Sequence, residues 1–160
     1  IMKYLTIVRH AEAEPLRNLH SDFERSLTEY GISEADRVSR KTAQNILQPE
    51  MLISSPAQRA VQTARIFAAA FNIPQDAILT DMLIYTGSAS DIIQVISHWN
   101  DAVSRVILFG HNPTVAELVM RFYPQFSGSF PTCSVCSLEF PADCWKKLAA
   151  TPPNLRFQNS

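Results

Sequence analysis

The sequence has little net charge and no long apolar run, and both absences limit what the protein can bind. Its 160 residues carry a formal net charge of −1, so the overall charge gives no sign of nucleic acid or an anionic membrane as a partner. The longest apolar stretches, such as "VILFG" and "RIFAAAF", are far shorter than the roughly 20 residues that a membrane-spanning helix needs. No signal-peptide pattern precedes the first predicted strand. We therefore expect no nucleic-acid partner and no membrane partner.

Cysteine is also scarce. The chain has three cysteines, an odd number that argues against a disulfide framework and favours a reducing, cytoplasmic location. Cys133 and Cys136 form a C-x-x-C pair, but in the β-like stretch "CSVCSLEF" their side chains would point to opposite faces of a strand. No second pair of Cys or His has the spacing of a zinc site. We expect these cysteines to pack in the core, and we expect no metal.

The composition indicates one globular unit. Hydrophobic residues make up 46% of the chain and charged residues 18%, which is typical of a compact protein rather than a disordered one. A chain of this length is able to bury its own core, and it contains no internal repeat, low-complexity tract or linker. We predict a single domain over residues 2–160, with Met2 as the natural start.

Strand-like runs alternate with helical patterns along the chain. The main strands are predicted at Lys3–Val8, Met51–Ser54, Arg105–Phe109 and Val135–Phe140, with weaker ones at Ala77–Leu79 and Leu155–Phe157. Helices are predicted from Thr28 to about Leu47, from Ser55 onward, and over Ser90–Trp99 and Asn112–Tyr123. This alternation predicts an α/β domain with a largely parallel sheet.

Two of the helices carry recognisable start signals. Thr28 is a candidate N-cap, and the inner stripe of its helix is predicted to contain Ile32, Ala35, Val38, Thr42 and Ile46. The next helix is predicted to start with Ser55 as its N-cap, Pro56 at the first helical position and Gln58 completing a capping box. Its apolar face would consist of Ala60, Ala64, Phe67, Ala68 and Phe71.

Basic residues and histidines follow three of the predicted strands. Arg9 and His10 come directly after the first strand, Arg59 begins the helix after the second, and His111 follows the strand "RVILF". A single histidine or arginine at a strand end is usually just solvated. The carboxyl ends of parallel strands, however, meet at one edge of a sheet, where ligands bind. Because three separate ends agree, we predict that the four side chains share one pocket.

The chemistry of such a pocket favours a dianion, and a phosphoryl group is the dianion that we predict. Guanidinium groups match its oxygens in bidentate fashion, and helix N-termini add free N–H groups; Arg25 is a further candidate. Neighbouring cations would depress the pKa of His10, and a hydrogen bond to one ring nitrogen would leave the other as a nucleophile. His20 and His98, by contrast, are expected to be ordinary solvated side chains.

At these residues the sequence resembles the histidine phosphatase superfamily, which includes phosphoglycerate mutases and acid phosphatases. The resemblance rests on "VRHAEAE", "LISSPAQRAVQTA" and "ILFGHNP", three segments that occur in the family's order and spacing. The short chain, "RSLTEYG" and "GHNPT" are most similar to the SixA-type phosphohistidine phosphatases. The resemblance implies a phosphoglycerate mutase-like fold, a three-layer sandwich with a central, mostly parallel sheet flanked by helices. It also implies an enzyme that needs no metal and no organic cofactor.

The resemblance also implies roles for individual residues. His10 would be the nucleophile that becomes phosphorylated, with Arg9, Arg59 and His111 completing the phosphate pocket, and His111 would also help protonation. Arg25 would be a further phosphate or substrate contact. Ser55 lies in the matching loop, where its role is mainly capping.

One family feature has no clear counterpart. Larger members use a carboxylate as the general acid, and here Asp81 in "LTDMLIYTG" is the first candidate, with Glu12 second. A labile P–N bond would explain a weak or missing acid, because a departing imidazole is a better leaving group than an alkoxide. The absence of long insertions leaves an open pocket, which suits a phosphorylated protein surface.

Three functions remain open at this stage. The leading prediction is a SixA-type phosphatase that acts on phosphohistidine in a protein partner, such as a phosphotransfer domain in signal transduction. The alternatives are a small-molecule phosphomonoesterase acting on a small phosphate ester, and a non-catalytic phosphate-binding docking module. A phosphoglycerate mutase is disfavoured, because the polar pattern that usually follows the nucleophile in those enzymes is absent after "RHAEAE".

Overall fold

A computed structural model describes residues 1–16 and 21–160 of the chain, and His20 lies outside the described residues. Its centre is a six-stranded sheet in the order β3-β2-β4-β1-β5-β6. The strands are β1 (Lys3–Arg9), β2 (Met51–Ser54), β3 (Leu79–Thr80), β4 (Arg105–Gly110), β5 (Val135–Phe140) and β6 (Asn154–Asn159). The weak strand thus lies two residues later than predicted, because residues 75–77 form a short 3-10 helix (η2, Gln75–Ala77).

The sheet is mostly parallel. β3, β2, β4 and β1 pair in parallel, whereas β5 pairs antiparallel with β1, and β6 pairs antiparallel with β5. Phe109 of β4 is in register with Val8 of β1 and with Ser54 of β2. The three parallel strands therefore end at the same level, and the segments that follow them emerge together at one edge.

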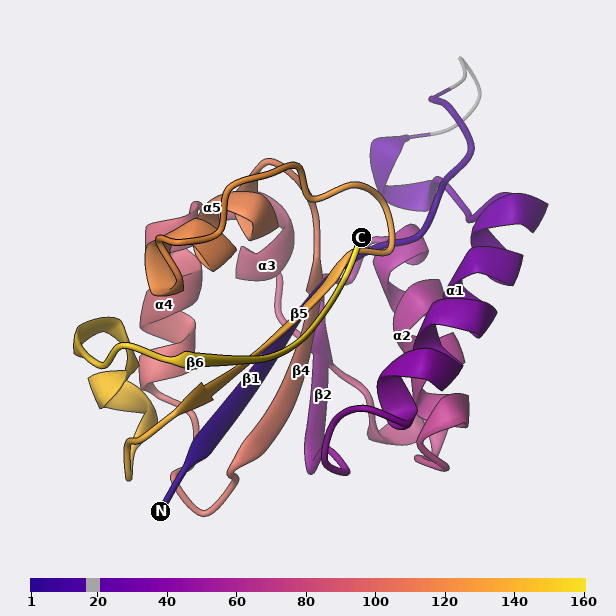
Figure 1. The fold of residues 1–160 in the computed structure, drawn as a ribbon. Helices are drawn as coiled ribbons and strands as arrows, with labels where there is room; N and C mark the ends of the chain where they lie inside the picture. Colours follow the sequence, from indigo (N-terminus) through magenta and orange to yellow (C-terminus); the bar gives the residue numbers. More distant parts are fainter. Residues whose placement is uncertain (17–20) are drawn as a thin grey trace.

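Helices cover both faces of this sheet, as Figure 1 shows. α1 (Glu29–Ala43) and α2 (Gln58–Ala70) lie on one side. α3 (Leu83–Thr86), α4 (Ala89–Ser97) and α5 (Thr114–Phe122) lie on the other. Two further 3-10 helices are η1 (Asp22–Glu24) and η3 (Trp145–Ala150). The arrangement confirms the predicted α/β class with three layers.

Two apolar cores form because successive side chains of a strand point to opposite faces. Leu5 and Ile7 of β1 belong to the core under α4 and α5, whereas Val8 belongs to the core under α1 and α2. Cys136 of β5 lies in the first core, and Cys133 lies in the second, so the two thiols pack on opposite sides of the sheet. Cys133 is in the turn before β5 rather than in the strand, where the prediction placed it. Burial raises the pKa of each thiol to about 12, which leaves both as packing groups rather than reactive thiolates.

The first helix differs from its prediction at its end and on its buried face. Thr28 caps α1 as predicted, accepting a hydrogen bond from the Gly31 amide at 2.9 Å, but the helix ends at Ala43 rather than near Leu47. Ile32, predicted to lie on the inner stripe, is 50% exposed. The buried face of α1 uses small residues instead and includes Gly31, whose backbone packs against Glu12.

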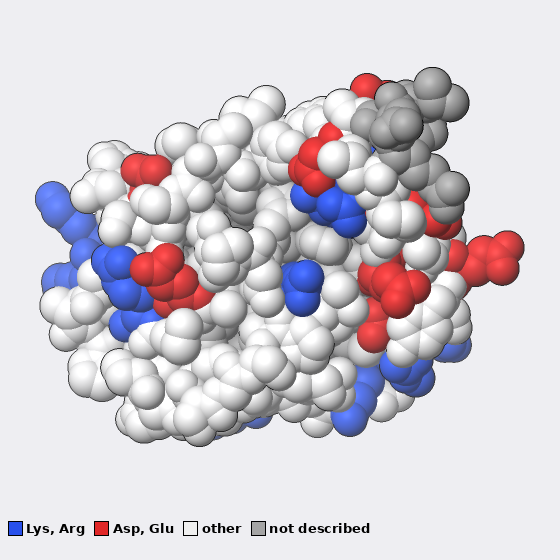
Figure 2. Space-filling model, turned by 90° about the horizontal axis from the view of Figure 1, so that it is seen from above, with Lys and Arg blue, Asp and Glu red and all other residues white. Residues whose placement is uncertain are grey.

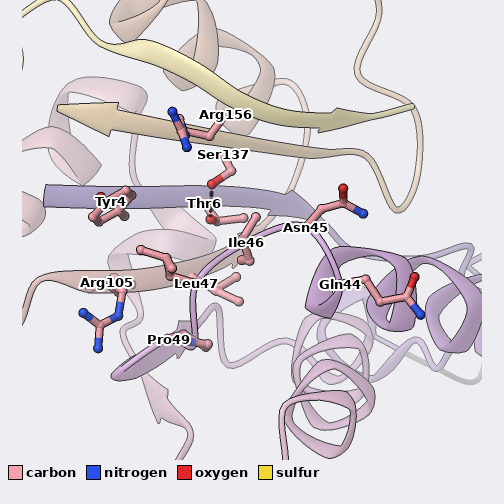
Figure 3. A pocket seen from close by; sticks show the side chains of 12 residues that line it. Tyr4, Thr6, Gln44, Asn45, Ile46, Leu47, Pro49, Arg105, Ser137 and Arg156 are labelled. Carbon is pink, nitrogen blue, oxygen red and sulfur yellow. Dashed lines mark hydrogen bonds between the residues drawn. The ribbon is translucent and has the colours of Figure 1, made fainter.

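A pocket opens on the sheet beside the first half of β1, next to the chain that follows α1 (Figure 3). The Thr6 hydroxyl donates a hydrogen bond to Ser137 Oγ at 2.9 Å within it. Arg105 and Arg156, which also line the pocket, are within 4 Å of the carboxylates of Glu50 and Glu139. This pocket does not include any of the predicted site residues, which follow the far end of the strand. None of the helices in residues 1–16 and 21–160 is both long and apolar enough to cross a membrane.

Candidate active site

Arg9 and His10 are held by the sheet itself. The Arg9 amide donates to Ser134 O at 3.0 Å, and the His10 amide donates to Gly110 O at 3.1 Å. The His10 carbonyl accepts a hydrogen bond from the Cys133 amide at 3.0 Å. Because its backbone is fixed on both sides, the His10 side chain, whose residue is 6% exposed, has a defined place at the end of β1.

The ring of His10 is oriented by one short hydrogen bond. Nδ1 lies 2.7 Å from the carbonyl oxygen of Ala11. A carbonyl only accepts hydrogen bonds, so Nδ1 carries the proton and Nε2 carries the free lone pair. The pKa of His10 is lowered to about 4, mainly by burial and to a smaller extent by the charges of Arg59, Arg9 and Arg25, against the opposing effect of the Ala11 hydrogen bond. Burial thus outweighs the neighbouring cations that we predicted as the cause.

His111 is brought against His10 from the end of β4. The two ring centroids are 5.2 Å apart, and His111 Nε2 lies 2.7 Å from Ser55 Oγ. The Ser55 hydroxyl is fully buried and accepts a hydrogen bond from the Ala57 amide. Among the described residues, His111 Nε2 is the only atom to which this hydroxyl can donate its own proton. Since a buried hydroxyl needs an acceptor, Ser55 donates a hydrogen bond to His111 Nε2. His111 therefore carries its proton on Nδ1. Burial, followed by the charge of Arg59, lowers the pKa of His111 to about 3.

Ser55 was predicted to cap the helix that follows β2, and the structure gives it another role. α2 begins at Gln58 with Ala57 as its N-cap, and no side chain caps it, so the capping box predicted for Ser55, Pro56 and Gln58 is wrong. The Ser55 hydroxyl is used instead to orient His111. Ser55 follows β2 at the sheet edge, which is why it meets a residue from the end of β4.

Arg59 and Arg25 meet at a carboxylate that the sequence reasoning missed. Arg59 Nη1 donates to the Asp22 carbonyl at 2.7 Å and Nη2 to Asp22 Oδ2 at 3.0 Å. Arg25 Nη1 donates to Asp22 Oδ1 at 2.9 Å, and the Tyr85 hydroxyl donates to Oδ2 at 2.8 Å. The spacing of Asp22 and Arg25 was a usable signal for an ion pair, whereas nothing in the sequence indicated Tyr85, whose ring also packs edge-on against His111.

Asp22 is ionised in this arrangement. Partial burial by itself would raise the pKa of Asp22, but the hydrogen bonds from Tyr85, Arg25 and Arg59 outweigh it and hold the pKa at about 2. The hydrogen bond to Asp22 raises the pKa of the Tyr85 hydroxyl, so this hydroxyl keeps its proton and remains a donor. Figure 2, which views the edge at which the parallel strands end, shows one basic group surrounded by uncharged surface near the centre of this face and another lying directly beside acidic atoms farther toward the grey atoms.

Several buried donors of the site have no partner among the described residues. They are Arg9 Nε, Arg59 Nε and His111 Nδ1. Among the residues that the structure describes, the Arg9 guanidinium makes one long contact, from Nη1 to Phe130 O at 3.4 Å. Buried donors without a partner are costly, so a group with several anionic oxygens would be stabilised here. The arrangement fits a phosphoryl group.

The two candidate acids lie apart from this cluster. The Asp81 carboxylate accepts a hydrogen bond from the Leu83 amide at 2.9 Å, and its backbone bonds with Ser54 and Ile84. It borders a separate hollow with His98 and Trp99. The exposed Glu12 carboxylate accepts from the Thr28 hydroxyl at 2.8 Å. Asp81 as general acid stays a prediction that none of its contacts supports.

Two neutral imidazoles and two buried or half-buried arginines, gathered where the parallel strands of a mostly parallel sheet end, define a phosphoryl-binding α/β protein. The model of the histidine phosphatase superfamily (branch 1) matches residues 5–84, half of the chain. The chain belongs to this superfamily, and it is a phosphatase. An uncharacterised protein of Picosynechococcus is 31% identical over 114 residues, which cover 71% of this chain and 68% of that protein.

Solved structures agree on the fold. A protein from Agrobacterium tumefaciens, assigned as phosphohistidine phosphatase SixA, superposes with a TM-score of 0.83 at 24% identity over 99% of this chain and 97% of that one. A SixA complexed with tungstate gives 0.82 at 22% identity over 98% and 96% of the two chains. A mycobacterial glucosyl-3-phosphoglycerate phosphatase is more distant, at 0.64 and 13% identity over 97% of each chain.

Proposed function

We propose that this chain is a phosphohistidine phosphatase of the SixA type, which hydrolyses its substrate through a covalent phosphohistidine on His10. The observation that carries the proposal is the orientation of His10, whose Nδ1–H is held by the Ala11 carbonyl at 2.7 Å. Nε2 is thereby left as an unprotonated nucleophile at neutral pH, because the pKa of the ring is about 4. The overall likeness to SixA structures, at TM-scores of 0.82–0.84, supports the choice within the superfamily.

The proposed reaction has two displacements at phosphorus. In the first, His10 Nε2 attacks the phosphorus, a new N–P bond forms, and the bond to the leaving group breaks with its electron pair going to that group. In the second, water attacks the phosphorus, the His10–P bond breaks, and inorganic phosphate leaves. Arg9, Arg59 and the Nδ1–H of His111 would stabilise the charge on the equatorial oxygens in both steps.

A phosphorylated protein is the substrate that we favour. The SixA structures superpose with TM-scores of 0.82–0.84, whereas the phosphatase of a small sugar phosphate gives 0.64. A departing imidazole also needs less help from a general acid than an alkoxide does, and Asp81 and Glu12 both hydrogen-bond elsewhere. The cytoplasmic location and a role in signal transduction stay predictions.

The test is a rapid-quench experiment with a phosphohistidine peptide that carries a phosphorus label. The protein is mixed with the peptide, quenched in alkali, which preserves phosphohistidine, and digested to locate the label. We expect label on His10, none in His10→Ala, and normal labelling in His98→Ala. His98 is a suitable control because it is exposed and its ring hydrogen-bonds to Ser97 and Gln94 of the adjoining helix, α4. Tight phosphate binding without any labelled residue would instead identify a docking module.

A further inference from the structure

Asp22 lies on the more exposed side, or mouth, of the site in which His10 is buried. His10 is at the bottom of the site, with 6% of the residue exposed, and the buried side chain of Arg59 is 7% exposed. The Asp22 side chain, bonded to Arg59, is 40% exposed and therefore stands between the buried cations and solvent. In-line displacement requires the leaving group to depart on the side opposite the attacking nitrogen. Because His10 is buried, the leaving group departs toward solvent, and Asp22 is the carboxylate on the exposed side of Arg59.

The mouth has an aromatic wall as well as a carboxylate. Tyr85 packs edge-on against His111 at 5.5 Å between ring centroids and against Phe23 at 5.2 Å. Phe23 belongs to the same short helix, η1, as Asp22. A flat, polar ring such as an imidazole would thus meet one aromatic surface and one anionic group as it leaves.

The Asp22 carboxylate has acceptor capacity to spare. Oδ2 accepts two hydrogen bonds, from Arg59 and Tyr85, and Oδ1 accepts one, from Arg25. A carboxylate has about four lone-pair sites, so Oδ1 retains one that no described residue uses. The two guanidinium groups keep this carboxylate anionic and offset its repulsion of the phosphoryl group.

We propose that Asp22 determines specificity, by accepting a hydrogen bond from the protonated ring nitrogen of the leaving imidazole of phosphohistidine. This rests on the function proposed above. When the P–N bond breaks, its electron pair neutralises the imidazolium, which leaves as neutral imidazole with its other nitrogen still protonated. No proton transfer is needed, and Asp22 remains a carboxylate throughout.

The same group disfavours phosphate esters. The leaving oxygen of an ester gains negative charge as the P–O bond breaks, and an ionised Asp22 would repel that charge and has no proton to donate. The leaving group of phosphohistidine is an imidazolium, which is positively charged before the P–N bond breaks and neutral afterwards. An anionic neighbour such as Asp22 favours the protonated imidazolium in the bound substrate. One carboxylate therefore acts in opposite directions on the two substrate classes.

The experiment compares Asp22→Asn with the wild-type protein on two substrates, a phosphohistidine peptide and p-nitrophenyl phosphate. Asparagine keeps the shape and one acceptor oxygen but removes the charge. We expect kcat/KM for the peptide to fall about 10- to 100-fold, the effect of one charge-assisted hydrogen bond. We expect kcat/KM for the aryl ester not to fall, and to rise by up to about threefold, because the repulsion of its leaving oxygen is removed. Glu24→Gln is the matched control, because it removes an exposed charge from the same short helix and should change neither value.

Each other outcome has a definite meaning. If kcat/KM falls equally for both substrates and the Ki for inorganic phosphate rises, Asp22 only holds Arg25 and Arg59 in place. That result would overturn the specificity proposal. A rise in ester turnover with unchanged peptide turnover would overturn it too, because the carboxylate would then be a competitor for the phosphate site. A wild-type protein that cleaves the ester but not the peptide would refute the proposed function itself, before any variant is compared.

Discussion

The neutral state of His10 makes a quantitative prediction about how stability depends on pH. Burial lowers the pKa of this ring from its ordinary value of 6.5, which applies to the unfolded chain, to about 4 in the folded protein. The unfolded chain therefore binds more protons than the folded one between these two values. By linkage, the contribution is fully present above pH 6.5 and is lost as the pH falls toward 4. Going from pH 7 to pH 5, this one group should cost about 2 kcal/mol of the free energy of unfolding.

The assay is urea unfolding at pH 7 and pH 5 for the wild-type protein and for His10→Asn, which has no group that titrates in this range. The stability lost between the two pH values should be about 2 kcal/mol larger in the wild-type protein than in the variant. His98→Asn controls for the loss of an exposed imidazole. Other groups titrate as well, His111 among them, but their contributions cancel in the difference if the variant keeps the fold. A difference below about 0.5 kcal/mol would mean that His10 titrates normally, and the argument for a neutral nucleophile set by burial would fail.

Three further predictions concern packing and caps. In Gly31→Ala, the added Cβ would lie 2.1 Å from the Glu12 carbonyl oxygen, so we expect a loss of about 1–3 kcal/mol in urea unfolding, with Gly31→Ser no better. Thr28→Ala removes the N-cap of α1 and should cost about 1 kcal/mol, while Thr28→Ser should recover most of it. In a double-mutant cycle, Thr6→Val and Ser137→Ala should each lower the free energy of unfolding, because each removes one partner of their hydrogen bond. The double variant should lose about 1 kcal/mol less than the sum of the two single losses. Strictly additive losses would show that the hydrogen bond contributes nothing to stability.

The fold and the meeting of the strand ends follow from patterns that are local in the sequence. Buried strands of four to seven residues alternate with amphipathic helices, and each strand runs directly into Arg9-His10, Ser55 or His111. Parallel pairing then places these ends side by side whatever the details of packing. That is why Arg9, His10, Arg59 and His111 could be grouped from the sequence, although their catalytic roles stay a prediction.

The parts that the sequence did not reveal depend on contacts between distant side chains. Tyr85 reaches Asp22 across 63 positions of the chain, and Ser55 reaches His111 across 56. No spacing rule connects such pairs, because they meet only after α3 and the loop after β2 have packed. The end of α1 was misplaced for a related reason. Ile46 and Leu47 continue the apolar pattern of the helix, but Ile46 packs against the core from the chain that follows the helix.

The enclosure of β1 has a consequence for enzyme kinetics. This strand pairs with β4 on one side and β5 on the other, and the His10 amide and carbonyl are both bonded at its end. His10 can therefore change its position only if β1 separates from both β4 and β5, which amounts to unfolding the sheet. A destabilising substitution in either core should accordingly reduce the number of working molecules without changing the speed of each one. In a pre-steady-state experiment the burst amplitude would shrink, while turnover per titrated site would stay constant.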